Sequence, residues 1–185
     1  MADPKTLLEK VANCMAAGAV SRSAQQSILA QASSSFALRP TGKPATIPTG
    51  FDPLAATLFE CAVEAAYLVA TADGEFDAAE RETFVAVMQS ACDHVRVPEL
   101  QALVDDLAEQ LSEDGTARRI EVVSSLVQTT EQKREVLRIA ALMALASGGI
   151  DALERGILDQ LCTGFALTGS VVDEVVAEVR AAVEA

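Results

Sequence analysis

The chain has 185 residues, of which 50% are hydrophobic, so it is long enough to bury a core without disulfide bonds or a structural metal. Its formal net charge of −13 repels polyanions, which argues against nucleic acid and anionic membranes as partners. No stretch reaches the roughly 18 uncharged apolar residues that a membrane span needs, so we expect no transmembrane helix.

The first residues, Met-Ala-Asp-Pro-Lys, carry an acid where a signal peptide has positive charge, and Glu9 and Lys10 interrupt the apolar run that follows. We therefore expect a cytoplasmic protein that is not exported. The four cysteines lie far apart in helix-like contexts, at Cys14, Cys61, Cys92 and Cys162. Without a C-x-x-C pair, this pattern is typical of small buried side chains in a reducing compartment.

The N-terminal part of the chain predicts a helical arm and a linker. Residues 5–36 are compatible with helix, broken near 18–23, but their small and polar residues leave a weak apolar stripe. Residues 40–53 contain four of the six prolines and predict an extended connection. We therefore expect a loosely attached helical arm (1–39), a proline-rich linker (40–53) and a helical domain (54–185).

The helical domain opens with a core helix. Asp52 supplies the N-cap and Pro53 the first turn of a helix that runs to about Ala72. Its polar residues form a narrow stripe on an otherwise apolar cylinder, at Thr57, Glu60, Glu64 and Thr71. A helix of this composition belongs in the core.

A peripheral amphipathic helix begins at Pro98. Its apolar residues recur with helical spacing on one face, at Leu100, Leu103, Val104, Leu107 and Leu111. The segment 113–127 predicts a shorter helix, delayed by Gly115.

The C-terminal part predicts two more helices with buried faces. Thr129 and Gln132 form a capping-box pattern for a helix that runs to Ala146, whose last eight residues are all apolar. The last helix starts at Ser170, and its apolar face consists of Val172, Val175, Val176, Val179 and Val183. The chain therefore predicts an all-α bundle of about seven core helices, preceded by the helical arm.

Two segments of the chain repeat one pattern. Residues 72–81 (Ala-Asp-Gly-Glu-Phe-Asp-Ala-Ala-Glu-Arg) align without a gap on residues 146–155 (Ala-Ser-Gly-Gly-Ile-Asp-Ala-Leu-Glu-Arg). Each copy has the features of a helix end, a glycine turn and a capped helix. The repeat predicts two similar halves related by a pseudo-twofold axis.

The acidic residues of these turns have two interpretations. In the first, Asp77, Asp151 and Glu154 cap helices, because Asp-x-x-Glu before an apolar run is a capping box. In the second, carboxylates gathered in one turn repel each other and attract a divalent cation or a basic partner. These carboxylates are Asp73, Glu75, Asp77 and Glu80.

The first turn also matches the closing part of an EF-hand loop, Asp-Gly-x5-Glu. The upstream part does not fit, since the opening ligand positions are Val69 and Thr71, inside a predicted buried helix. The second copy has Ser147 in place of Asp73. We therefore do not expect a true EF-hand.

With this motif the chain resembles the TerB-like tellurite-resistance family, in which a helix ends in Ala-Asp-Gly and a Glu-Arg pair opens the next helix. The resemblance covers about 51–183 and extends to the N-terminal domain of membrane-anchored DnaJ-like co-chaperones. It implies a pseudo-symmetric helical bundle whose acidic turns come together and bind metal. The implied ligands are Asp73, Glu80 and Glu154, while Ser147-Gly148 departs from the family's Asp-Gly and lowers the charge of the second turn.

Enzymatic chemistry finds no support in the chain. His94 is the only histidine, and no serine or cysteine lies in a nucleophile signature. The basic pair Arg118-Arg119 is expected on a solvated helix face.

The alignment of the two halves suggests that the polar stripes of the two core helices pair with each other. Glu60 and Glu64 correspond to Arg134 and Arg138. If the two core helices pack about a pseudo-twofold axis, these stripes would meet as ion pairs between them.

These observations predict a non-enzymatic stress or tellurite-resistance module that binds a protein partner or a divalent cation through its acidic turns. The candidate metal ligands are Asp73, Glu75, Asp77, Glu80 and Glu154. Beyond such a cation no cofactor is expected. The expected partner is a protein, with membrane-associated proteins among the options, and the chain itself is expected in the cytoplasm or at the inner face of the membrane. The oligomeric state stays open, with a dimer among the options. The alternative is a metal-free helical scaffold that binds partners through an apolar groove between the halves or through its N-terminal arm.

Overall fold

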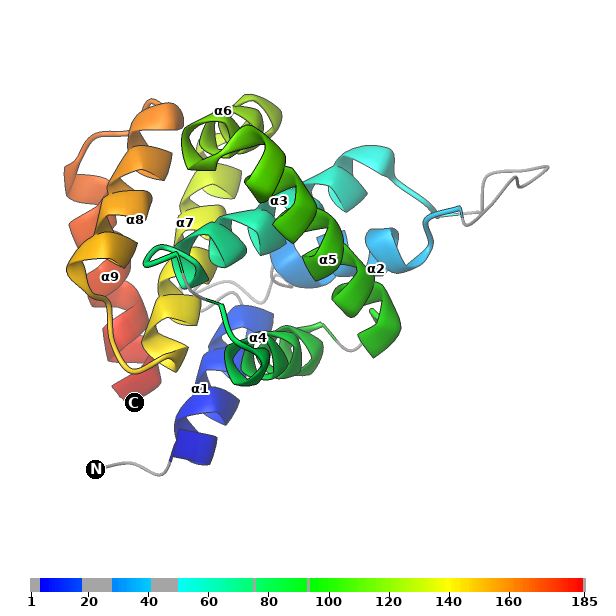
Figure 1. Cartoon of the computed structure of the whole chain (residues 1–185), viewed down its shortest axis with the longest axis horizontal. Coiled ribbons are helices and arrows are strands. Elements are labelled where there is room, and N and C mark those ends of the chain that lie inside the picture. The colour runs from blue at the N-terminus through cyan, green and yellow to red at the C-terminus, as the bar shows by residue number, and fades with distance from the viewer. Residues whose placement is uncertain (1–3, 18–27, 41–49, 75, 93, 185) are drawn as a thin grey trace.

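The computed structural model describes residues 4–17, 28–40, 50–74, 76–92 and 94–184, and these residues form nine α-helices and no strand. The helices are α1 (Pro4–Ala17), α2 (Ile28–Ala37), α3 (Pro53–Ala70), α4 (Ala78–Ala91), α5 (Val97–Asp114), α6 (Thr116–Leu126), α7 (Thr130–Ala146), α8 (Ala152–Gly164) and α9 (Ser170–Glu184). In Figure 1, α3 and α7 cross the middle of the bundle and the other helices surround them. The predicted all-α bundle with about seven helices after the linker is confirmed.

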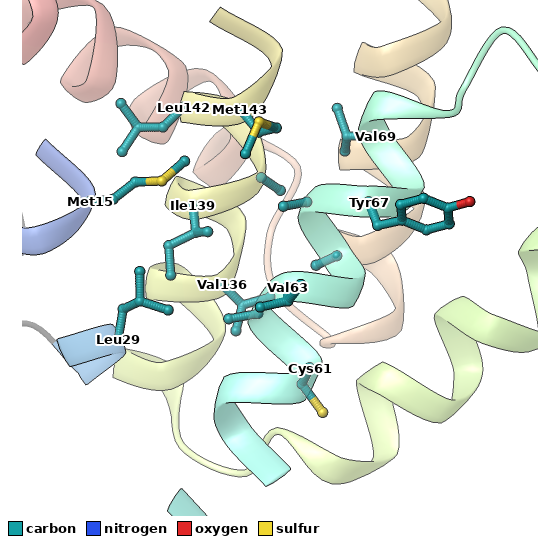
Figure 2. Packing of buried hydrophobic residues seen from close by; sticks show 14 of the residues in the cluster. Met15, Leu29, Cys61, Val63, Tyr67, Val69, Val136, Ile139, Leu142 and Met143 are labelled. Atoms are coloured by element: carbon teal, nitrogen blue, oxygen red, sulfur yellow. The ribbon is translucent and has the colours of Figure 1, made fainter. Parts of the chain in front are cut away.

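The centre of the fold is the contact between α3 and α7. All α3 residues from Cys61 to Val69 are buried, and so are all α7 residues from Ile139 to Ala144. Figure 2 shows Val63 of α3 next to Val136 of α7. By length and composition α3 is the one described helix that would suit a membrane span. However, 61% of it is buried inside the bundle, as is typical of the core helix of a folded domain.

The helix boundaries follow local signals in the sequence. Asp52 Oδ1 accepts hydrogen bonds from the backbone N–H groups of the first turn of α3, at 2.9 and 3.3 Å. The predicted starts near Pro98, after Thr129 and at Ser170 are confirmed to within one residue. Residues 113–127 are divided, because α5 continues to Asp114 and α6 begins only after Gly115, whose φ of +76° turns the chain.

The N-terminal helices are not loosely attached, so that expectation is wrong for the described residues. The helix α1 packs against α4, α7 and α9, and α2 packs against α3. Their fully buried side chains include Val11, Met15, Leu29 and Phe36. The small residues that weaken the apolar stripe of α2 also allow it to approach α3 closely, and the Ser35 hydroxyl donates to the Asp52 carbonyl at 2.9 Å. The division into arm, linker and domain stays a prediction, and residues 18–23 and 41–49 lie outside the described residues.

The hypothesis that the polar stripes of α3 and α7 pair with each other is wrong. Glu64 binds Arg119 of α6, with 2.6 Å between Oε1 and Nε. Arg138 pairs with Glu135 in its own helix, and Arg134 pairs with Glu174 and Glu178 of α9. The two core helices have different outer neighbours, so their polar stripes face different helices. Arg119 is buried, which also corrects the expectation of a solvated Arg118-Arg119 pair.

Candidate functional site

The first acidic turn connects α3 to α4. Asp77 Oδ1 accepts from the backbone N–H groups of Ala79 and Glu80 at 2.7 and 2.9 Å, and Glu80 Oε2 accepts from the Asp77 N–H at 2.9 Å. This is the predicted capping box. Asp73 lies exposed in the turn itself, beside Gly74, whose φ is +85°. Glu75 lies outside the described residues.

The second acidic turn connects α7 to α8 and repeats this geometry. Asp151 Oδ1 accepts from the N–H groups of Leu153 and Glu154 at 2.7 and 2.9 Å, and Glu154 Oε2 accepts from the Asp151 N–H at 2.9 Å. Ser147 donates a hydrogen bond of 3.3 Å to Glu154 Oε1. The cap interpretation of Asp77, Asp151 and Glu154 is therefore confirmed, and Glu80 has the same role.

The arginine that ends each copy of the motif joins its helix to the next one. Arg81 binds Asp105 of α5 at 2.6 Å, and Arg155 binds Asp173 of α9 at 2.8 Å. In both halves an arginine–aspartate pair thus connects the two helices of a hairpin. This role was not predicted from the sequence, although an arginine at the same place in both copies was the signal that could have revealed it.

The two turns act on each other electrostatically. Burial raises the pKa of the half-buried Glu154 carboxyl, and the negative charges of Asp151 and Asp73 raise it further. Hydrogen bonds from the Asp151 N–H and the Ser147 hydroxyl oppose this shift. Asp73 therefore lies close enough to Glu154 for its charge to act between the two turns, which follow the C-terminal ends of α3 and α7.

The fit of a metal ion to these turns depends on the oxygens that remain after capping. The charge of Asp73 in the first turn reaches Glu154 in the second. Both oxygens of Glu154 already accept a hydrogen bond, Oε2 from the Asp151 N–H and Oε1 from the Ser147 hydroxyl. Within the described part of the chain, which lacks Glu75, no three carboxylate, imidazole or thiol groups converge as metal ligands. Two carboxylates suit Mg²⁺, which keeps several water molecules, better than the six to eight protein oxygens typical of Ca²⁺.

An aromatic cluster supports the first turn only. The Phe76 ring meets Tyr67 edge-on at 5.2 Å and Phe84 at 6.1 Å between ring centroids. In the second copy the aligned residues are aliphatic: Ala141, Ile150 and Leu158. The two turns thus share their caps but not the side chains beneath them.

The cysteines take the places that the sequence predicted. Cys61, Cys92 and Cys162 are buried and Cys14 is half-buried. Burial, together with the charges of Glu64 and Glu60, raises the pKa of the Cys61 thiol to about 12. This shift lowers further the small thiolate fraction that a free cysteine has at neutral pH.

The structure is a helical bundle with two similar halves. Each half has a capped acidic turn and an arginine-linked hairpin, and this is the class of protein that the TerB-like resemblance implies. A family model, described as Tellurite resistance protein TerB, matches residues 60–175 and includes both copies of the motif. The match covers more than half of the chain, which therefore belongs to the TerB family. None of the curated proteins and none of the solved structures matches it.

Proposed function

We propose that this protein is a non-enzymatic module of a stress or tellurite response that recruits a divalent cation through its paired acidic turns. Membership of the tellurite-resistance family supports the cellular role. The observation that carries the proposal is the effect of Asp73 in one turn on Glu154 in the other. Burial is the main cause of the raised pKa of Glu154, and a cation between the two carboxylates would offset the smaller part that the charge of Asp73 adds.

The remaining acids of the turns have supporting roles in this proposal. Asp77, Glu80 and Asp151 use at least one oxygen each to hold the helix starts. They fix the two turns in position, and their negative charge favours a cation nearby. Glu75 stays a predicted ligand of the same site.

Calorimetric titration of the whole chain with Mg²⁺, Ca²⁺ and Zn²⁺ tests this function. We expect saturable binding by the wild type, and a loss of about tenfold or more in affinity in Asp73→Asn and in Glu154→Gln. Glutamine can still accept the capping hydrogen bond, so Glu154→Gln keeps the helix start. Glu109→Gln, which removes an exposed charge on α5, is the matched control and should bind like the wild type.

The alternative is the metal-free scaffold. If none of the three cations gives saturable binding, the cation proposal is wrong and the scaffold is favoured. A titration in which Glu109→Gln weakens binding as much as Asp73→Asn would show only a general effect of charge, and it would also contradict a site at the turns.

A further inference from the structure

A cavity of about 180 Å³ lies between α3, α5 and α6, beside the buried ion pair of Glu64 and Arg119. The three helices contact one another, and Figure 1 shows α5 and α6 beside α3. Asp106 of α5 and Leu126 of α6 line the cavity and are exposed, so it is open to solvent on their side. We call this feature the α3–α5–α6 cavity. It lies apart from the acidic turns, none of whose residues lines it.

The acidic side chains of the cavity outnumber the basic ones. Three carboxylates, those of Glu60, Glu64 and Asp106, face one guanidinium group, that of Arg119, which leaves a net charge of −2 among the lining residues. Arg119 is already bound by Glu64 at 2.6 Å and by Asp114 at 3.0 Å. Glu60 and Asp106 form no ion pair with any described residue. Their charges are therefore available to a ligand.

Glu60 carries its charge in an unfavourable place. It is half-buried, and burial is the main cause of its raised pKa; the charge of Arg39 lowers this pKa, while those of Glu64 and Asp106 raise it. The Arg39 guanidinium stacks on the Phe36 ring, with 3.8 Å between Cζ and the ring centroid, and makes no ion pair with Glu60. A cation bound beside Glu60 would stabilise its carboxylate form.

The buried ion pair supplies an independent observation. The Glu64 side chain is only 8% exposed, and its Oε1 atom binds Arg119. Its Oε2 atom accepts no hydrogen bond within the described part of the chain, and Glu64 lines the cavity. Buried carboxylate oxygens are normally satisfied by donors. A group with N–H donors in the cavity would complete the hydrogen bonding of this carboxylate.

The size and the walls of the cavity favour an organic cation over a metal ion. At about 30 Å³ per water molecule, the cavity holds about six water molecules or a ligand with a similar number of non-hydrogen atoms. Leu103, Leu107 and Leu126 form apolar walls that suit methylene groups. Among the described residues no three acidic, imidazole or thiol groups converge as metal ligands. The guanidinium group of Arg119 also repels a divalent ion more strongly than a single ammonium group.

We propose that the α3–α5–α6 cavity binds a short alkylammonium group. The ammonium nitrogen lies near Glu60, Glu64 and Asp106, and the methylene chain contacts the leucines of α5 and α6. Free alkyl diamines carry this group, and so do lysine side chains. This site goes beyond the proposed cation site at the turns and does not require it.

Calorimetric titration of the whole chain with butane-1,4-diamine tests the proposal, because this diamine matches the size of the cavity. We expect saturable binding of the diamine and no binding of butane-1,4-diol, which has a similar size but no charge. A third probe, Nα-acetyl-lysine methylamide, distinguishes the two sources of the group. Binding of this probe as tight as that of the diamine would assign the cavity to a lysine side chain, and weaker binding would assign it to a free amine.

Two variants locate the binding site. Glu60→Gln and Asp106→Asn each remove one charge and keep the size of the side chain, and we expect each to weaken diamine binding by about tenfold. Glu109→Gln is the matched control, because Glu109 is exposed on α5 and does not line the cavity. Thermal unfolding shows whether the variants are folded. The diamine should raise the Tm of the wild type more than that of Glu60→Gln.

The possible results separate this proposal from its rivals and from the cation site. Absence of saturable diamine binding, or equal binding of the diamine and the diol, would overturn it. Equal weakening by Glu60→Gln and Glu109→Gln would show a general attraction to the net charge of −13 and would also overturn it. Asp73→Asn and Glu154→Gln should keep diamine binding, so a failure of the cation proposal leaves this one standing.

Discussion

The two halves of the molecule begin with the same motif and end with different surroundings. In both, an aspartate caps the second helix and an arginine links that helix to the third. The helices that pack against that second helix differ: α1 contacts α4, whereas α6 contacts α8. The repeat therefore specifies how a hairpin starts and how its two helices are linked. What packs against the hairpin from outside is specified by residues beyond the repeat.

The largest expected effect tests how α6 is fixed between the halves. Arg119 of α6 binds Glu64 of α3, and Glu64 is only 6% exposed. Arg119→Met leaves this carboxylate buried without its partner, so we expect a loss of about 3–5 kcal/mol in the free energy of unfolding. Urea denaturation measures it. Arg118→Met is the matched control, since Arg118 pairs with Glu121 in solvent and should cost less than about 1 kcal/mol.

A loss in Arg119→Met no greater than in Arg118→Met would contradict the buried pair. It would also mean that α6 is held by its apolar residues alone. A double variant, Glu64→Leu with Arg119→Met, should recover much of the stability, because it leaves no buried charge.

The second prediction concerns the contact between α6 and α8 at Gly164 and Ser124. Gly164→Ala forces a Cβ against Ser124 where α6 crosses α8, and we expect a loss of about 1–3 kcal/mol in the free energy of unfolding. Gly156→Ala, in the same helix, meets no atom within 4 Å and should stabilise by about 0.5–1 kcal/mol. Thermal unfolding of the two variants separates them. If both changes stabilise the protein, the close contact of α6 and α8 is wrong.

The third prediction tests whether the aspartates of the two turns contribute equally to stability as helix caps. Asp77→Ala and Asp151→Ala each remove an acceptor of two backbone N–H groups, so each should cost about 1 kcal/mol. The asparagine variants at both positions should lose little, since asparagine caps as well as aspartate. Chemical denaturation checks both pairs. A much larger loss in one turn would show that its aspartate does more than cap.

The helices and caps could be predicted from the sequence because their causes are local. Asp52-Pro53, Thr129 with Gln132, and both Asp-x-x-Glu boxes act within a single helical turn. The partner of Glu64 could not be predicted, because it depends on where α6 lies in space. Arg118 and Arg119 are adjacent in sequence, and only packing decides which of them is buried.

The acidic locus could be predicted only through the repeat. The repeat predicted that the two turns come together, and the charge of Asp73 contributes to the raised pKa of Glu154. A shared site at the turns stays a prediction. Local rules had no means of finding which helices pack against α4 and α8, because α1 and α6 lie outside the repeated segments. The same applies to the N-terminal helices, whose weak apolar stripes gave no sign of how deeply Val11 and Phe36 are buried.

The smallest effect concerns the electrostatic contact between the turns. Burial first, and the charges of Asp151 and Asp73 next, raise the pKa of Glu154 in the folded state above its unfolded value. The folded state therefore holds this proton more tightly, and the contribution of Glu154 lowers the free energy of unfolding as pH rises from the ordinary glutamate pKa of about 4.3 through the raised value.

Asp73→Asn removes one of these charges, so stability should fall less steeply over this pH range than in the wild type. Urea denaturation at a series of pH values between about 4 and 7 measures the slope. Glu109→Gln on α5 is the control for loss of an exposed charge. Identical slopes in the wild type and in Asp73→Asn would mean that the charge of the first turn does not reach the second. In that case the two halves share a motif without sharing a site, and the acids of each turn are caps alone.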